Sequence, residues 1–155
     1  MSQPRLHLVH GRTSVGQSTP SWPSRYDEQA RSALPDGPWI SWRLLGANNR
    51  ELGRGALRYP DAARCLEAML DLRLAVLGGR STVGTSVHGG LWGWRIDLDG
   101  IRVAVAGRLY QRQRECRYNL TQFLAALPAA LLPTQPHDRR RAEVRGGVLA
   151  GAQEP

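Results

Sequence analysis

The chain contains no lysine, so all 21 of its basic residues are arginine. It has only two cysteines and one phenylalanine in 155 residues. Two cysteines without metal-ligand spacing exclude a disulfide scaffold and a cysteine-based zinc site. The longest apolar runs are too short for a membrane helix, and the N-terminal residues lack the apolar stretch of a secretory signal. We therefore expect a reducing, cytoplasmic setting with no membrane contact.

The excess of positive charge is the first clue to a partner. The formal net charge is +8 at pH 7, which favours acidic partners. The arginines are spread thinly along the chain, whereas a dedicated nucleic-acid surface usually concentrates its charge. Arginine in place of lysine, together with abundant Ala, Gly and Pro, also indicates the codon usage of a GC-rich genome. Arginine content alone therefore does not predict nucleic-acid binding.

Residues 91–105 carry the clearest structural pattern, that of a β-hairpin. Large apolar residues alternate with small or polar ones up to Leu98, as in a strand with one buried face. Asp99-Gly100 follows, a dipeptide that two-residue hairpin turns prefer because both positions need positive φ. The turn predicts four cross-strand pairs: Leu98 with Ile101, Asp97 with Arg102, Ile96 with Val103, and Trp94 with Val105.

The same order of features occurs twice. Trp42-Arg43-Leu44 matches Trp94-Arg95-Ile96 in a first strand. A turn at Ala47-Asn48-Asn49, where Asn tolerates the left-handed conformation, sets Leu44 opposite Leu52. Short third strands are then expected, one ending near Tyr59 and one spanning Gly107 to Tyr110. Five residues separate each tyrosine from a cysteine, Cys65 or Cys116, that lies on an amphipathic helix.

We predict an α+β fold with two tandem β-β-β-α repeats, which form an antiparallel sheet backed by two amphipathic helices, and with flexible termini. The predicted boundaries are a largely flexible N-terminal segment at 1–38, a first repeat at 39–77, a Gly-rich linker at 78–91, a second repeat at 92–127 and a disordered tail at 128–155. Within the N-terminal segment, Leu6 to Val9 fits a short strand, and Ser24 to Leu34 fits a short helix.

This pattern resembles the YegP-like family, whose short β-β-β-α units have no defined biochemical role. The resembling residues are WRLLGANNRELGRGALRYPDAARC at 42–65 and WRIDLDGIRVAVAGRLYQRQREC at 94–116. The resemblance covers roughly residues 39–127. The chain departs from the family in its Asp-Gly second turn and in the long Gly-rich link between the units. The resemblance implies the fold and a cytoplasmic setting, and it brings no catalytic residue.

Few residues suggest chemistry. We expect both cysteines to be small, buried and inert; the alternative is a redox pair, since Arg114 and Arg117 flank Cys116. His7, His10, His88 and His137 do not cluster, so no metal site is predicted. Residues 78–82 resemble a phosphate-binding loop but lack its Lys-Ser/Thr ending. No cofactor is expected.

A candidate binding surface follows from the strand alternation. Trp42 and Trp94 are expected in the core, which turns the neighbouring arginines to the opposite face of the sheet. Trp39 or Trp92, at a sheet end, could instead contact a protein or a nucleic-acid base. A plainly solvated arginine face is the competing interpretation. The candidate surface comprises Arg43, Trp92, Arg95, Arg102, Arg112 and Arg114.

The sequence therefore favours a small non-catalytic binding or interaction module with a protein partner. The alternative is a nucleic-acid-binding protein that uses the arginine-bearing sheet face, an idea based on fold analogy. An enzyme ranks third, because paired carboxylates, a histidine cluster and a nucleophile with a neighbouring base are all missing from the pattern. The sequence predicts no oligomeric state.

Overall fold

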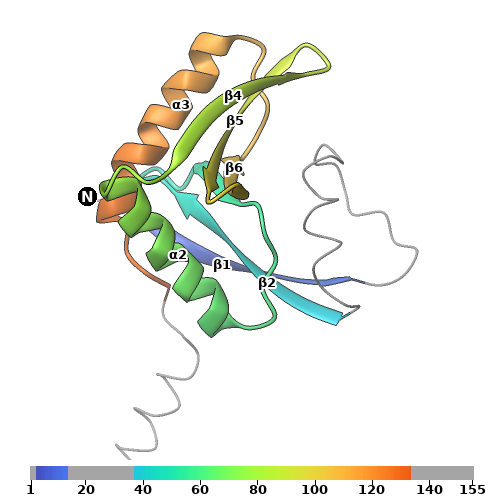
Figure 1. Cartoon of the computed structure of the whole chain (residues 1–155), viewed down its shortest axis with the longest axis vertical. Helices are drawn as coiled ribbons and strands as arrows, with labels where there is room; N and C mark the ends of the chain where they lie inside the picture. The colour runs from blue at the N-terminus through green and yellow to red at the C-terminus, as the bar shows by residue number, and fades with distance from the viewer. Residues whose placement is uncertain (1–2, 14–36, 134–155) are drawn as a thin grey trace, which may run out of the picture.

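The computed structural model describes residues 3–13 and 37–133. These residues form one six-stranded antiparallel sheet with strand order β1-β2-β3-β6-β5-β4, and two helices pack against one face of it (Figure 1). The elements are β1 (Arg5–Thr13), β2 (Gly37–Leu45), β3 (Glu51–Gly55), α2 (Ala62–Leu77), β4 (Thr82–His88), β5 (Leu91–Leu98), β6 (Ile101–Ala106), α3 (Gln113–Ala126) and the short 3-10 helix η1 (Leu127–Ala129). The α+β class with an antiparallel sheet and two helices is confirmed.

The core lies between the sheet and the two helices. Trp42 from β2 and Trp94 from β5 are 2% and 0% exposed, and both rings contact Phe123 of α3 at centroid distances of 6.3 and 4.7 Å. Gly53 of β3 makes room for the Trp94 and Phe123 rings, since a Cβ there would lie 2.5 Å from the first and 2.7 Å from the second. The sheet therefore needs a glycine beneath its largest side chains.

The first helix ends where the glycines at 78 and 79 predict, but it begins later than Pro60 suggests. Pro60, which suits the first turn of a helix, instead precedes the N-cap residue Asp61. Asp61 caps α2, with its Oδ1 accepting a hydrogen bond from the Arg64 N–H at 2.8 Å. At the other end the Gly78 N–H donates to the Leu74 carbonyl, and Gly79 takes a φ of +68°. These two ends fix where the chain leaves the sheet and returns to it as β4.

Both hairpins contain a bulge that the sequence prediction missed. Asp99 and Gly100 have φ values of 51° and 78°, and the pairs Leu98–Ile101 and Asp97–Arg102 are confirmed. Beyond them the register shifts by one residue, so the predicted pairs Ile96–Val103 and Trp94–Val105 are wrong. The observed pairs are Ile96 with Ala104 and Arg95 with Val105.

The physical reason for the shift is the space that the tryptophans need. The bulge turns Ala104 and Ala106, both fully buried, toward the helices beside Trp94, while Val105 faces the other way. The first hairpin shows the same effect after its predicted turn, where Asn49 has a φ of 63°. There Leu44 lies opposite Gly53 rather than the predicted Leu52.

The predicted Gly-rich linker at 78–91 is largely a strand. Residues 82–88 form β4, which pairs along its length with β5. Gly89 and Gly90, with φ values of 56° and 81°, make the tight turn between them. The glycines of this segment thus serve a hairpin turn, and the β-branched residues between them give it strand propensity.

The predicted third strands after β3 and β6 are also corrected. Tyr59 and Tyr110 each form only an isolated bridge, to Ile40 and Trp92 respectively. The third strand beside each hairpin instead precedes it in the chain, as β1 and as β4. The chain cannot continue a regular ladder at the tyrosines because it turns there toward the helices.

The two predicted flexible ends are partly ordered. The expected strand at Leu6–Val9 is confirmed and extends over β1, which pairs with β2. Near the other end, Ala130 is 3% exposed, its carbonyl accepts a hydrogen bond from Arg73 at 2.6 Å, and Leu131 bridges to Arg5. The tail predicted for 128–155 therefore packs against the rest of the fold as far as Leu131. The helix expected from Ser24 to Leu34 and the tail from 134 onward lie outside the described residues.

Within 3–13 and 37–133, neither helix combines the length and apolarity that crossing a bilayer requires.

Candidate functional site

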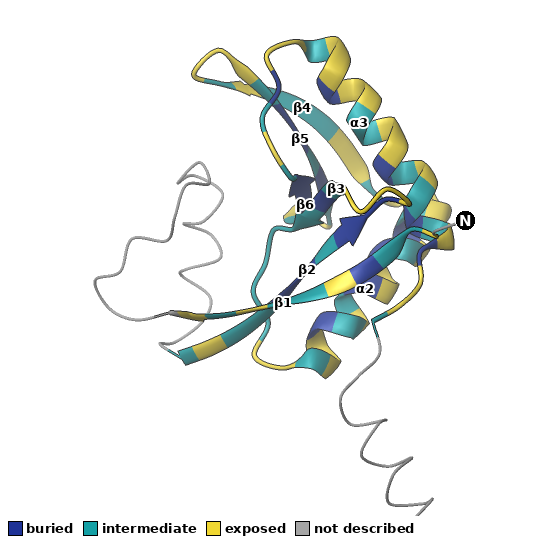
Figure 2. Cartoon of the chain, turned by 180° about the vertical axis from the view of Figure 1, so that it is seen from behind, coloured by how far each residue is buried: buried dark blue, intermediate teal, exposed yellow. Residues whose placement is uncertain are grey.

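The sheet presents arginines on the face that no described helix covers, called here the helix-free face. Arg43 lies between buried Trp42 and Leu44, so strand alternation turns it away from the core. Arg95 lies between Trp94 and Ile96 in the same way. Both residues are partly exposed, and Figure 2 colours the strands of the sheet by the burial of each residue.

The strand register aligns these arginines in a single row. Arg43 pairs with Arg54 of β3, Arg54 pairs with Val105 of β6, and Val105 pairs with Arg95 of β5. Neighbouring strands lie about 4.8 Å apart, so the row spans about 14 Å between Arg43 and Arg95. Arg43, Arg54 and Arg95 are called the arginine row below.

The charges along the row are unequally compensated. Glu51 binds Arg54 through both carboxylate oxygens, at 2.7 and 2.9 Å. Asp97 lies 3.5 Å from the Nε atoms of both Arg95 and Arg102. Arg43 has no carboxylate partner among the described residues, and its buried Nε makes no hydrogen bond. The row therefore contains one uncompensated cation directly opposite another arginine.

An aromatic group extends the helix-free face at the far end of β2. Trp39 points to the same side of β2 as Arg43, and its ring lies over Gly11 of β1, where a Cβ would clash with it. The Arg58 guanidinium carbon lies 4.4 Å from the centre of the Trp39 ring. Of the two tryptophans considered for an outer contact, Trp39 is the one on this face.

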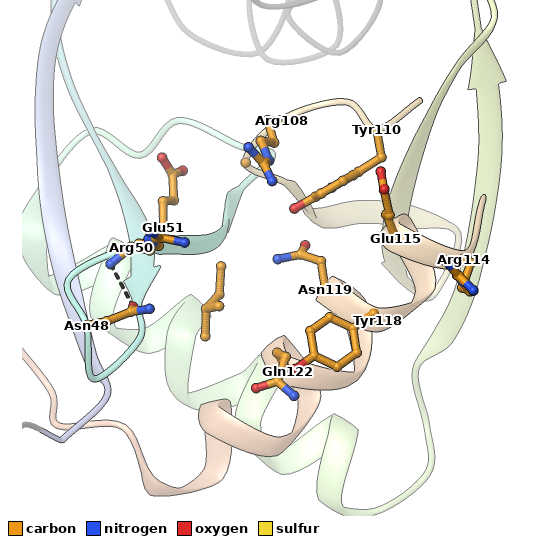
Figure 3. A pocket seen from close by; sticks show the side chains of 12 residues that line it. Asn48, Arg50, Glu51, Arg108, Tyr110, Arg114, Glu115, Tyr118, Asn119 and Gln122 are labelled. Carbon is orange, nitrogen blue, oxygen red and sulfur yellow. Dashed lines mark hydrogen bonds between the residues drawn. The ribbon is translucent and has the colours of Figure 1, made fainter. Parts of the chain in front are cut away.

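The structure brings together three of the six residues of the predicted binding surface. Arg43, Arg95 and Arg102 share the helix-free face. Trp92 packs instead against the core, because it shares a strand face with Trp94, and its backbone pairs with Tyr110. Arg112 precedes α3 as its exposed N-cap residue, and Arg114 lies on α3 beside a cleft (Figure 3). The helix covers the opposite face, so these last two residues do not join the arginine row.

Arg54 is the residue of the row that sequence reasoning missed. In the predicted register Arg43 faces Gly53, and Arg54 therefore points toward the core. The bulge after Leu44 moves the pairing by one residue and brings Arg54 opposite Arg43. Gly53, which lies beneath the Trp94 ring, was the one local sign of this arrangement. It marks the side of β3 that faces the core, so its neighbour Arg54 must lie on the helix-free face.

The two cysteines match the inert interpretation in their burial. Cys65 and Cys116 are both free and 0% exposed. Burial raises the pKa of the Cys65 thiol to about 12. Burial also raises the pKa of Cys116, although the positive charge of Arg117 acts in the other direction. Neither thiol is thus poised as a thiolate near neutral pH. Among the residues that the structure describes, no three His, Cys, Asp or Glu side chains gather in a way that could hold a metal ion.

Comparison with known proteins identifies the fold and nothing more specific. No family model matches the chain, and no curated protein matches it. The solution NMR structure of yegP from E. coli, a protein of unknown function, matches with a TM-score of 0.51 and 9% sequence identity. The match covers 61% of this chain and 80% of yegP. At this identity the likeness concerns the fold alone, and it confirms the resemblance seen in the sequence: the chain has a YegP-like fold.

Proposed function

We propose that this chain is a non-catalytic binding module that holds an acidic segment of a partner protein on its helix-free face. The arginine row carries the proposal. Two like charges directly opposite each other in a sheet are destabilising, and Arg43 faces Arg54 without a carboxylate of its own in the part of the chain that the structure describes. A carboxylate supplied by a partner would offset this repulsion.

The carboxylates on the same face favour a protein over a nucleic acid. Glu51 and Asp97 stand beside the row at 2.7 Å from Arg54 and 3.5 Å from Arg95. A nucleic acid carries a negative phosphate at every nucleotide, so its backbone would be repelled by Glu51 and Asp97 as it ran along the row. A protein can place a carboxylate beside Arg43 and a hydrogen-bond donor beside Asp97, so its charges can match the pattern.

Nucleic-acid binding is the second candidate, and the row together with Trp39 favours it. Three arginines in line can contact successive phosphates, and an indole can stack on a base. Each phosphate contact releases counterions, so three contacts on a single strand predict a slope of about −2 in a plot of log affinity against log salt.

Fluorescence anisotropy with two labelled probes separates the candidates. The probes are a glutamate-rich peptide and an oligothymidine, each titrated with the wild-type chain and with the double variant Arg43→Ala/Arg95→Ala. We expect the peptide to bind more tightly than the oligonucleotide, and the double variant to lose about tenfold or more in peptide affinity.

The matched control is Arg64→Ala/Arg117→Ala, which removes the same charge from two exposed helical positions. It should retain most of the peptide affinity. Equal losses in the two double variants would mean that net charge alone attracts the peptide. Tighter oligonucleotide binding, with the steep salt slope and collapse in the row variant, would establish the second candidate instead.

We also propose that the two halves of the chain are copies of one β-β-β-α unit, β1-β2-β3-α2 and β4-β5-β6-α3. The bridge between Ile40 and Tyr59 corresponds to that between Trp92 and Tyr110. Cys65 and Cys116 then occupy equivalent, fully buried positions. If the halves are copies, Trp42→Ala and Trp94→Ala should lower the free energy of unfolding by similar amounts. A difference of more than about 2 kcal/mol between these two buried sites would argue against equivalence.

A further inference from the structure

A second surface of the molecule is hollow and rich in polar groups. At the end of the sheet where β3 begins and β6 ends, a cleft of about 1130 Å³ lies beside the N-terminal half of α3 (Figure 3). Three separate segments line it: the β2–β3 turn, the loop after β6 and one side of α3. The α3 residues Glu115, Tyr118, Asn119 and Gln122 follow helical spacing, so they form one stripe beside the buried stripe of Cys116 and Phe123.

Asn119 is the best-defined group in this cleft. The Trp94 indole N–H, which can only donate, lies 2.6 Å from the Asn119 Oδ1. This hydrogen bond fixes the orientation of the amide, so its Nδ2, with two N–H donors, must point away from Trp94. Figure 3 shows the side chain projecting into the cleft. A core tryptophan thus orients a donor toward an open site.

The charged groups around Asn119 add further donors. Arg108 lies at the rim, with its guanidinium carbon 4.9 Å from the centre of the Tyr110 ring, and Arg50 lines the side formed by the turn. Glu51 is also in the lining, but both of its carboxylate oxygens bind Arg54. Glu115 is the remaining carboxylate, and its side chain is exposed. The lining therefore holds three arginines, Arg50, Arg108 and Arg114, against one carboxylate that does not already bind an arginine.

The cleft also has an apolar wall. Leu52 is half-buried in the lining, and the Tyr118 side chain, at 67% exposed, is a large aromatic residue left open to solvent. A volume near 1000 Å³ is the upper range of small-molecule sites, which combine apolar walls with a few oriented polar groups.

We propose that this cleft binds a phosphorylated small molecule of about nucleotide size. Its phosphate accepts hydrogen bonds from Asn119 Nδ2 and the Arg108 guanidinium, and its flat part packs against Leu52 and Tyr118. A phosphate suits donors that come from two different segments, because its oxygens are arranged tetrahedrally and carry up to two negative charges. The arginine row does not line this cleft, so this proposal stands apart from the proposed function.

Titration of the full ¹⁵N-labelled chain with AMP, followed by NMR, tests the proposal. AMP should shift the Asn119 side-chain amide signals and the backbone amides of Gly107, Arg108 and the turn at 48–52. Adenosine, which lacks the phosphate, should bind at least about tenfold more weakly, since charge-assisted hydrogen bonds are lost. Benzoate, a flat carboxylate, should also bind more weakly than AMP.

Asn119→Asp is the decisive variant. The aspartate keeps an oxygen that accepts from Trp94, but it removes both donors and adds a negative charge. We expect AMP affinity to fall about tenfold or more, while the spectrum remains that of the folded chain. If this variant does not fold, Arg108→Gln at an exposed position carries the test, with a several-fold loss.

Two controls distinguish the site from general charge effects. Arg117→Gln removes an equal charge from α3 outside the cleft and should leave AMP affinity unchanged. Arg43→Ala/Arg95→Ala should also leave it unchanged, which separates this proposal from the proposed function. Absence of shifts at the cleft amides, equal binding of adenosine, or unchanged binding by Asn119→Asp would overturn the assignment.

Discussion

On the helix-covered face of the sheet, Trp42 and Trp94 are at most 2% exposed, whereas their chain neighbours Arg43 and Arg95 stay partly exposed on the helix-free face. On the covered face, the small residues glycine and alanine lie beneath the large aromatic rings, so the side chains of the sheet and the helices fit together closely. The helix-free face carries the arginine row and Arg102 beside Glu51 and Asp97. This difference implies that substitutions on the two faces should separate stability from binding.

The largest effect on stability is expected at the centre of the covered face. Trp94 is 0% exposed and its ring lies 4.7 Å from that of Phe123. Trp94→Ala should lower the free energy of unfolding by about 3–5 kcal/mol, because it leaves a cavity in the core. Chemical denaturation measures the change. A loss below about 1 kcal/mol would show that the core does not depend on this residue.

A glycine pair compares the two faces directly. An added Cβ at Gly53 would lie 2.5 Å from the Trp94 ring and 2.7 Å from Phe123, whereas at Gly84, on the helix-free face, the nearest atom is 3.5 Å away on Arg95. Gly53→Ala should destabilise by about 1–3 kcal/mol through overpacking.

Gly84→Ala is the matched control for Gly53→Ala. It should be neutral or slightly stabilising, since alanine restricts the unfolded chain. Equal effects of the two substitutions in denaturation experiments would contradict the difference in packing between the faces.

The buried thiol of Cys65 predicts that the protein becomes less stable at alkaline pH. Burial raises the pKa of Cys65 to about 12 from a reference of 9.0. The folded state therefore holds its proton where the unfolded state loses it, so this stabilisation is complete below pH 9 and is lost as the pH rises toward 12.

The expected slope is at most about 1.4 kcal/mol per pH unit for one thiol. Urea denaturation of wild type and Cys65→Ala between pH 8 and about 11 measures it, and the variant should show the shallower decline. Tyr59, whose pKa is raised to about 12 from 10.0 by burial and by the negative charge of the neighbouring Cys65 thiolate, adds a decline of its own. The Cys65→Ala variant loses the thiolate charge, so this decline should also be shallower in the variant. Parallel curves would contradict the predicted role of Cys65.

The smallest effect on stability is expected in the arginine row. Arg43→Ala removes one member of a like-charged pair with Arg54, so the free energy of unfolding should change by less than about 0.5 kcal/mol or rise slightly. Denaturation at low and high salt checks the origin of the change, because screening should reduce any gain. A loss above about 1 kcal/mol would mean that Arg43 acts as a packing residue.

The sequence predicted the local parts of this structure. Asp99-Gly100, Asn49 and Gly78-Gly79 mark two turns and a helix end that the structure places where expected. These signals act over a few residues, so no knowledge of the tertiary structure was needed. The segment around β4 failed because glycines that make a tight turn look the same in sequence as glycines in a flexible link.

The candidate sites depend on contacts that the sequence does not encode locally. The pairing of β3 with β6 joins Gly53–Gly55 to Ala104–Ala106, about fifty residues apart in the chain. Only that pairing and the two bulges align Arg54 with Arg43 and Arg95. The cleft likewise gathers Asn48, Arg108 and Asn119 from three segments. The arginines themselves were visible in the sequence, but their arrangement was not.

The most direct test of the central claim maps where an acidic ligand contacts the sheet. A glutamate-rich peptide is titrated into the ¹⁵N-labelled chain, and amide shifts are followed in wild type and in Arg43→Ala/Arg95→Ala. We predict shifts concentrated at Arg43, Arg54, Arg95 and Val105, which disappear in the double variant while the signals of α2 and α3 stay unchanged. Shifts concentrated on the helices, or a pattern that survives in the double variant, would contradict the assignment of the helix-free face as the binding surface.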